Sequence, residues 1–224
     1  MRFLSAGDRA LLVELDLAAE AAEPAEAAPE PARLYRALMR DKPAGALEFV
    51  PAARTVLVRF DPALTSSALL AARIGEVARA IDDEAAGSGD AGDADVLEIP
   101  VRYDGEDLDD IARLAGLSVD EVVARHCAPV YTVAFCGFAP GFGYLTGLDD
   151  ALWLPRRAVP RTRVPAGSVA VADRYAAVYP QASPGGWNLL GRTDVAVWDA
   201  ARQPPAMFVP GVRVRFVAAS GLPR

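Results

Sequence analysis

The chain has 224 residues, 52% of them hydrophobic, which is enough to bury the core of one large domain or of two small ones. Its formal net charge is −7, and this acidic balance excludes a bulk electrostatic grip on nucleic acid. The basic residues gather late in the chain, where residues 151–224 hold ten arginines and three acidic residues. This excess suggests an anionic ligand or an acidic partner, with solvated surface as the alternative for most of these arginines.

The front of the chain predicts alternating strands and helices. One helix is indicated by Leu70, Ile74, Val77 and Ile81, which recur on a single helical face. The apolar runs and periodic segments give strands at 10–15, 45–50, 54–60 and 96–103, and helices at 32–41 and after Asp61-Pro62. This order of elements favours a small α+β layer.

Two segments of low complexity interrupt these elements. Residues 18–31 contain three prolines and predict a surface loop or a frayed helix start. Residues 82–95 are acidic, contain three glycines and predict a flexible connection. The sequence therefore predicts a small α+β domain at 1–95, with the acidic flexible connection at 82–95, and a second domain at 96–224.

The second domain is predicted to begin with helices and continue as strands. A short helix is expected at 107–115, and Ser118 and Glu121 form a capping-box pattern that opens another helix ending at His126. From Pro129 onward, short strand-like runs are separated by glycine and proline. Short strands with frequent turns predict a β-barrel or a β-sandwich.

His126 is the only histidine, which narrows the possible chemistry. The chain has no P-loop and no G-x-S-x-G elbow, and it cannot form a Ser-His-Asp triad without this residue. A helix C-terminus stabilises the imidazolium cation, so we expect its pKa to be raised. We predict a proton donor, with a hydrogen-bonding anchor or a cap of its own helix as alternatives.

Three stretches rich in glycine or proline are candidates for ligand binding. In FCGFAPGFGYLTGLDD, residues 135–150, glycines let the backbone bend towards a ligand while aromatic rings wall a pocket. PRRAVPRTRVPAGSV, residues 155–169, sets arginines between prolines, and guanidinium groups match carboxylate and phosphate oxygens. YPQASPGGWNLLGRT, residues 179–193, can turn backbone N–H groups towards an anion beside a flat tryptophan. The alternatives are surface charge for the second stretch and a tight barrel corner for the third.

The cysteines and the lengths of the apolar runs indicate the cellular compartment of the protein. Cys127 and Cys136 have a spacing that fits no common zinc or redox motif, so free buried thiols and no metal site are expected. No apolar run approaches the roughly 20 residues of a membrane helix, and the first residues lack a signal-peptide pattern. We expect a soluble, cytoplasmic protein that binds neither membrane nor nucleic acid.

The three stretches occur in an order that resembles the family of 5-oxoprolinase B subunits, whose members are also named kinase-A inhibitor and allophanate hydrolase subunit 1. The motif PPAMFVPGVRVRFV follows them, and GDRALLVEL and VPAARTVLVRFDP match the front of the chain. Only 17–31 and 82–95 fall outside the resemblance. It implies an α+β N-terminal domain followed by a mainly β, cyclophilin-like barrel.

The resemblance also implies an activity. With a homologous C subunit and an A subunit, such a chain forms an ATP-dependent 5-oxoprolinase that cleaves 5-oxoproline to L-glutamate, and it is expected to be inactive alone. The B–C pair resembles the two halves of the carboxyltransferase domain of urea carboxylase. ATP with Mg is the implied cofactor, shared with the partner subunit. No biotin is expected on this chain, because its only lysine, Lys42, lies in no biotin-carrier pattern.

Residue chemistry and motif position together define the predicted site. We predict catalytic roles for His126, Arg157 and Arg192. We predict ligand binding for Gly137, Phe138, Pro140, Gly141, Phe142, Tyr144, Arg156, Arg161, Pro165, Gly167, Ser168, Tyr179, Ser183, Gly185, Gly186 and Trp187.

One turn departs from the family pattern. The family often shows Gln-Thr-Gly where this chain has Asp173 to Ala177, and Ala176 and Ala177 offer no side-chain hydrogen bonds. If this turn contacts the substrate, we expect a difference in substrate specificity. Two alternative functions follow from the family names: an inhibitor that binds a sensor histidine kinase, and a subunit that acts on urea- or allophanate-type amides with a biotinylated partner.

Overall fold

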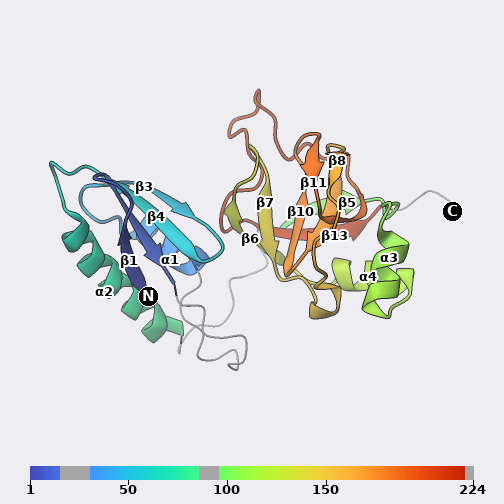
Figure 1. Cartoon of the computed structure of the whole chain (residues 1–224), viewed down its shortest axis with the longest axis horizontal. Coiled ribbons are helices and arrows are strands. Elements are labelled where there is room, and N and C mark those ends of the chain that lie inside the picture. Colours follow the sequence, from blue (N-terminus) through green and yellow to red (C-terminus); the bar gives the residue numbers. More distant parts are fainter. Residues whose placement is uncertain (16–30, 86–95, 220–224) are drawn as a thin grey trace. The chain divides into compact units, whose positions relative to one another are not determined.

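The computed structural model describes residues 1–15, 31–85 and 96–219 (Figure 1). The chain divides into two compact units, Met1–Gly92 and Asp93–Arg224. The predicted domain boundary between residues 95 and 96 adjoins a segment outside the described residues, and it stays a prediction. The low-complexity segment 18–31 also lies outside them, except for its last residue.

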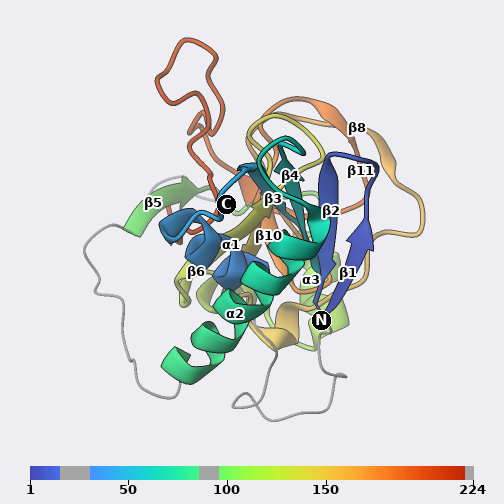
Figure 2. The same cartoon turned by 90° about the vertical axis from the view of Figure 1, so that its left-hand side faces the viewer.

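In its described residues, the first unit is a four-stranded antiparallel sheet with two helices on one face (Figure 2). The sheet order is β1-β2-β4-β3. Its elements are β1 (Arg2–Ser5), β2 (Ala10–Glu14), α1 (Pro31–Arg40), β3 (Ala46–Pro51), β4 (Thr55–Phe60) and α2 (Ser67–Ala85). Every second residue of β4 is buried, as a strand with one covered face requires, and Val56 and Val58 pack with Leu70 and Ile74 of α2.

The front-half predictions are mostly confirmed, with two differences. Strand β1 was not predicted, because four residues between charged and polar neighbours carry little alternation. Helix α2 runs to Ala85, so residues 82–85 do not belong to a flexible connection as predicted. An acidic run with few apolar residues can continue a helix whose earlier turns are already packed. Residues 86–95 lie outside the described part of the chain.

The described part of the second unit contains two α-helices and a seven-stranded mixed sheet of order β12-β9-β10-β7-β6-β13-β5. Its elements are β5 (Val96–Val101), α3 (Leu108–Ala115), α4 (Val119–Cys127), β6 (Tyr131–Cys136), β7 (Gly143–Thr146), the short 3-10 helix η2 (Asp150–Leu152), β8 (Arg161–Val164), β9 (Ser168–Ala172), β10 (Tyr175–Val178), β11 (Ser183–Gly185), β12 (Asn188–Arg192) and β13 (Arg213–Ala218). The capping box at α4 is confirmed: the Glu121 amide donates to Ser118 Oγ at 3.2 Å, and the Ser118 amide donates to the Glu121 carboxylate at 2.7 Å.

The two outer strands of this sheet meet at one backbone bridge. The Arg102 amide donates to the Arg192 carbonyl at 2.8 Å, and the Arg192 amide donates to the Arg102 carbonyl at 2.8 Å. Arg102 directly follows β5 and Arg192 ends β12, so the bridge brings the sheet close to a closed barrel. The α+β class with a barrel-like sheet is therefore confirmed, while the cyclophilin-like description stays a prediction.

Both faces of the sheet are covered at strand β9, because all five residues of this strand are buried. Val169 and Val171 point to the main core, where α3 and α4 also pack. Ala170 and Ala172 point to a second, smaller core on the opposite face. A separate two-stranded ribbon, β8 with β11, contributes Val164 to that second core. The predicted ligand-binding stretches gather on this face.

Candidate functional site

Aromatic rings from two of the predicted stretches form one cluster on this second face. Phe142 lies at its centre, with ring centroids 5.1 Å from Tyr144, 5.3 Å from Tyr179 and 5.5 Å from Trp187. The interplanar angles of 65° to 89° are edge-to-face arrangements, which the ring quadrupoles favour. Tyr144 also stacks on Phe135 at 4.3 Å. The structure therefore brings the first and third stretches together.

Phe138 stands out within this cluster because its side chain is exposed. The residue is 61% exposed, and its ring lies 5.1 Å from Phe142 and 6.3 Å from Tyr179. Its φ of 66° is in the left-handed region, which is costly for a bulky residue. An exposed ring held on a strained backbone at a loop tip is typical of a contact surface rather than of a core.

Two predicted glycines are required by close packing. A Cβ at Gly185 would lie 2.3 Å from the Tyr179 hydroxyl oxygen, and a Cβ at Gly167 would lie 2.3 Å from the Thr193 carbonyl oxygen. Gly167 also has a φ of 78°, which favours glycine. By contrast, a Cβ at Gly186 would have no neighbour closer than 3.6 Å. Gly185 and Gly167 therefore hold the framework together whether or not they also bind a ligand.

The remaining backbone positions of the prediction are mostly framework too. A Cβ at Gly141 would lie 2.5 Å from Cβ of Trp198. Ser168 is buried, and its carbonyl accepts from the Tyr179 amide at 2.9 Å. Pro140 and Pro165 are exposed, and Gly137 lies at the exposed start of the first loop. Ligand contacts at all these positions stay predictions.

Arg157 and Arg161 of the second stretch converge on one buried carboxylate. Oδ1 of Asp107 accepts from Nη1 of Arg157 and from Nη2 of Arg161, the latter at 2.8 Å. Asp107 is only 2% exposed. Arg161 also donates through Nε to Glu106 at 3.2 Å, and hydrogen bonding to Asp107 raises the pKa of its guanidinium.

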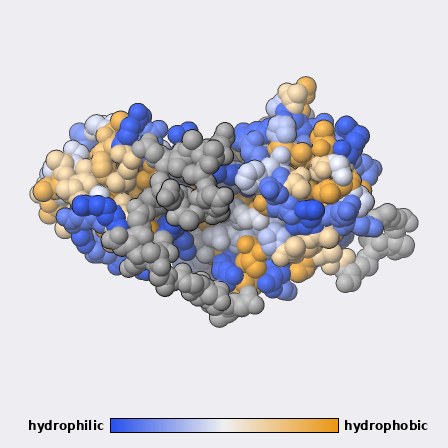
Figure 3. Space-filling view, turned by 90° about the horizontal axis from the view of Figure 1, so that it is seen from below, coloured by the Kyte–Doolittle hydropathy of each residue, from blue (hydrophilic) through white to orange (hydrophobic). Residues whose placement is uncertain are grey.

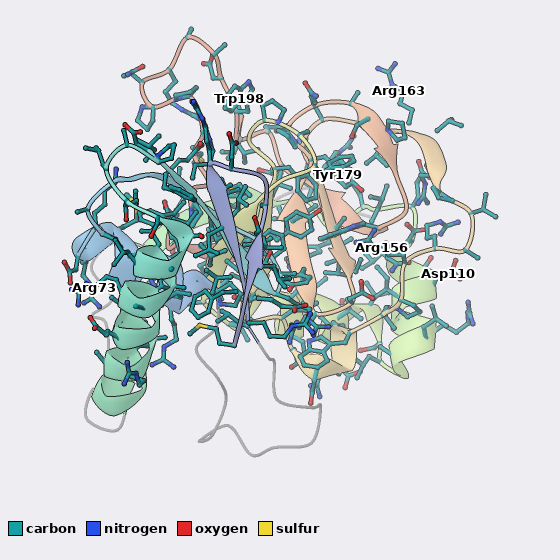
Figure 4. All side chains as sticks on the ribbon, turned by 60° about the vertical axis from the view of Figure 1, so that its left-hand side comes forward. Arg73, Asp110, Arg156, Arg163, Tyr179 and Trp198 are labelled. Carbon is teal, nitrogen blue, oxygen red and sulfur yellow. The ribbon has the colours of Figure 1, made fainter. Side chains whose placement is uncertain are left out.

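The other arginines of the prediction lie near the surface. Arg192 is 59% exposed at its side chain and pairs with Asp104 at 2.7 Å. Arg156 is 60% exposed and lies 3.8 Å from the Asp173 carboxylate. Arg163, on the same strand as Arg161, extends outward, away from Tyr179 (Figure 4). The structure thus groups Arg157 with Arg161 but gives Arg156 and Arg192 separate carboxylate partners.

Tyr179 belongs to the ring cluster and also lies within electrostatic reach of Arg156 and Arg161. Burial raises the pKa of its hydroxyl, while a hydrogen bond from the Trp187 backbone amide and the nearby charges of Arg156 and Arg161 lower it. The residue therefore lies where the apolar face meets the positive charge. A ligand with a flat apolar part and an anionic group matches this combination of surfaces.

His126 does not have the environment predicted for it. The side chain is completely buried and stacks on Phe216 with a centroid distance of 4.5 Å. Burial lowers its pKa to about 3, the opposite of the expected rise, because loss of water penalises the cation more than the helix end stabilises it. Nδ1 lies 2.7 Å from the Tyr103 hydroxyl, as a hydrogen-bonding anchor would. A neutral, enclosed imidazole gives no support to the predicted role of proton donor.

The two cysteines are free and have different surroundings. Sγ of Cys127 lies 3.1 Å from the Tyr103 hydroxyl. Sγ of Cys136 donates to the Phe208 carbonyl at 3.4 Å, and burial raises the pKa of this thiol. Both residues are half-buried rather than buried as expected. Free thiols are confirmed, and nothing in their contacts indicates catalysis.

The described residues include neither a candidate metal site nor a membrane-spanning helix. In the described ranges, no group of three or more acidic, histidine or cysteine side chains could hold a metal ion. No helix within those ranges is long and apolar enough to cross a bilayer. On the face shown in Figure 3, hydrophilic and hydrophobic residues are interspersed over both units.

Sequence reasoning missed Asp107 and Tyr103, which hold three of the predicted side chains. Asp107 is one of several acids between residues 104 and 110, and its spacing does not distinguish it from a solvated charge. The only available signal was the predicted helix start at 107, where an aspartate usually caps the helix. In the structure Asp107 makes no side-chain cap bond, because both of its oxygens are used elsewhere.

The family model described as carboxyltransferase domain, subdomain C and D, matches residues 1–208. The chain belongs to this family. The resemblance inferred from the motifs is thereby confirmed.

Among curated relatives, the B subunit of 5-oxoprolinase from Escherichia coli is 48% identical over 124 residues, which are 54% of this chain and 57% of that protein. The Bacillus subtilis protein of the same name is 41% identical over 128 residues, 56% of this chain and 53% of that protein. The matches span little more than half the length of these curated relatives.

Solved structures extend the likeness of this carboxyltransferase-family chain. The crystal structure of TTHA0988 covers 96% of it with 40% identity and a TM-score of 0.72, although the match is only 40% of that longer chain. A conserved uncharacterized protein from Pyrococcus horikoshii covers 97% of both chains with 33% identity and a TM-score of 0.54. The urea carboxylase of Kluyveromyces lactis is 20% identical to this chain, with a TM-score of 0.65. The match covers 97% of this chain and 22% of the urea carboxylase chain. This last likeness shows the fold alone.

Proposed function

We propose that this chain belongs to an ATP-dependent 5-oxoprolinase as its B subunit and that, with a homologous C subunit and an A subunit, it cleaves 5-oxoproline to L-glutamate. The observation that carries the proposal is the 48% identity to the B subunit of a 5-oxoprolinase over 124 residues. A cluster of aromatic rings around Phe142 supports it, because Tyr179 of this cluster feels the charges of Arg156 and Arg161. The chain is proposed to be inactive without its partners.

The chemistry of the substrate defines what such a surface must do. A lactam carbonyl is a poor electrophile, and phosphorylation of its oxygen creates a leaving group and a reactive carbon. Phosphoryl transfer needs positioning and positive charge more than it needs a protein nucleophile. Arg157 and Arg161 would hold the anionic groups, and the rings around Phe142 would exclude water on the apolar side.

The residues present fit the proposed cofactor in part. Arg157 Nε and Arg161 Nη1 are buried without a hydrogen-bond partner, and such donors suit phosphate oxygens. ATP, when bound, would supply the phosphoryl group that activates the lactam. The described residues offer no cluster of acidic ligands for Mg, so we propose that the nucleotide or the partner subunit holds the ion. Lys42 donates to the Leu47 carbonyl at 3.1 Å, in the first unit, and we propose that it carries no biotin.

The proposal also includes the type of barrel in the second unit and the cellular compartment of the protein. We propose that the barrel-like sheet of the second unit is a cyclophilin-like barrel, since β5 and β12 come together at Arg102 and Arg192. We also propose that the protein acts in the cytoplasm, where free thiols such as Cys127 and Cys136 stay reduced.

The test is ATP hydrolysis by the chain co-expressed with its candidate C and A subunits, measured with and without 5-oxoproline. Stimulation by 5-oxoproline that disappears when this chain is omitted is the expected result. Arg157→Ala should lower the stimulated rate, and Arg163→Ala is the matched control on a nearby exposed arginine. An assembled complex without stimulation would overturn the proposal. Binding to a sensor histidine kinase would then be the next function to measure.

A further inference from the structure

Asp107 lies at the point where three separate segments of the second unit meet. Its Oδ1 accepts from Arg157 and Arg161, which flank the loop before β8. Its Oδ2 accepts from the Leu189 amide of β12 at 2.8 Å. Both carboxylate oxygens are therefore engaged, and the side chain is 2% exposed. A buried carboxylate with all its contacts satisfied holds its partners in one geometry.

The two guanidinium groups and two carboxylates of this cluster balance formally, but only one of the carboxylates is buried. Two guanidinium groups share the single buried carboxylate of Asp107. The second acidic partner, Glu106, has a side chain that is 74% exposed, so water and salt screen its pairing with Arg161. Only one anion is therefore shielded from water beside the two cations, whose side chains are 35% exposed for Arg157 and 18% exposed for Arg161.

Each arginine also has a nitrogen without a partner. Nε of Arg157 and Nη1 of Arg161 are buried and make no hydrogen bond. Buried polar atoms in folded proteins are nearly always paired, so an unpaired donor calls for an explanation. Two such donors on neighbouring cations that share one carboxylate suit an acceptor that carries negative charge.

We propose that Asp107 is a positioning residue, which aims Arg157 and Arg161 at an oxyanion of the ligand. The oxyanion is a phosphoryl or a carboxylate group, because both offer the planar or tetrahedral oxygen edges that guanidinium forks match. The proposal deepens the proposed function and rests on it for the identity of the ligand. The anion site itself depends only on the geometry of these three side chains.

The Asp107→Asn variant separates positioning from simple charge balance. The asparagine keeps the shape of the side chain and an oxygen for the Leu189 amide, but it removes the negative charge. If Asp107 only neutralised the arginines, its removal would leave more positive charge and strengthen oxyanion binding. If Asp107 holds the arginines in place, its removal frees them to move and weakens oxyanion binding.

The experiment titrates the full chain, without partner subunits, with inorganic phosphate and separately with acetate. Calorimetry or NMR chemical shifts report the binding. Comparing the two anions decides between a phosphoryl and a carboxylate preference. We expect the wild-type chain to bind at least one of them. Arg161→Ala and Asp107→Asn should each raise its dissociation constant about tenfold or more. Arg161→Lys, which keeps the charge and loses the fork, should also weaken binding, and Arg163→Ala should leave it unchanged.

Several results would overturn the inference. One is that Asp107→Asn binds the anion as tightly as the wild type or more tightly. Another is that the wild type binds neither anion, and a third is that Arg161→Ala and Arg163→Ala lose the same amount of anion affinity. Thermal unfolding of each variant reports whether it is folded, and Arg157→Ala provides a second test if Asp107→Asn does not fold. The outcome is independent of the activity assay. A complex that lacks 5-oxoprolinase activity while the chain still shows Asp107-dependent phosphate binding would count against the proposed function alone.

Discussion

The hydroxyl oxygen of the half-buried Tyr103 lies 2.7 Å from Nδ1 of the fully buried His126 in the second unit. Burial raises the pKa of Tyr103 and lowers that of His126, so both side chains are neutral over the physiological range. The contact joins the segment after β5 to helix α4. His126 Nε2, on the other side of the ring, has no partner and is enclosed.

The first prediction concerns the pH dependence of stability. The pKa of His126 is about 3 in the folded chain against an ordinary 6.5, so only the unfolded chain binds this proton between those values. Stability is therefore lost as the pH falls from 6.5 towards 3, and it is fully present above 6.5. Between pH 7 and pH 5 this one group should cost about 2 kcal/mol of unfolding free energy.

The measurement is urea unfolding of the wild type and of His126→Gln at both pH values. The variant should be less stable at pH 7, because it disturbs packing on Phe216, but it should lose about 2 kcal/mol less on going to pH 5. Parallel losses in the two proteins would show that His126 does not carry the pH dependence.

A second prediction compares the neighbouring glycines of the third stretch. Gly185→Ala should destabilise the chain by about 1–3 kcal/mol, because its Cβ would lie 2.3 Å from the Tyr179 hydroxyl. Gly186→Ala is the matched control, since its nearest neighbours are at 3.6 Å. Removing the hydroxyl in a Gly185→Ala, Tyr179→Phe double variant should recover part of the loss. Thermal melts of the four proteins measure this, and equal effects of the two glycine variants would refute it.

A third prediction separates backbone strain from function at Phe138. Phe138→Gly should be more stable than Phe138→Ala by about 1 kcal/mol, because glycine tolerates a φ of 66° and alanine does not. Both variants lose the exposed ring, so both should lower the 5-oxoproline-stimulated ATPase of the assembled complex. Full activity in Phe138→Gly would show that the ring contacts neither ligand nor partner.

The fourth prediction concerns the exposed pair of Arg192 and Asp104. Their side chains are 59% and 44% exposed, so the ion pair should contribute less than about 1 kcal/mol to stability. Arg192→Ala should therefore melt close to the wild type, with Asp104→Ala as the control for the lost pair. If Arg192 is catalytic as predicted, only Arg192→Ala will reduce the stimulated rate. Equal rates in both variants and the wild type would remove Arg192 from the site.

Local patterns in the sequence were sufficient for much of this architecture. The capping box of Ser118 and Glu121 and the periodic apolar face of α2 involve residues a few positions apart, so the sequence specifies them directly. The frequent glycines and prolines after Pro129 likewise indicated short strands. The order of the motifs along the chain was also enough to indicate the family.

Distant contacts decided the rest. The sequence shows His126 at a helix end, but only packing against Phe216 from the last strand encloses it and reverses the direction of its pKa shift. Asp107 acquires its role from Arg157, Arg161 and Leu189, which are 50, 54 and 82 positions away. Spacing along the chain reports neither burial nor such partners, because both depend on which remote segments the fold brings together. The sequence alone determined most of the elements and indicated the family, and the tertiary structure determined which charges are shielded and which are shared.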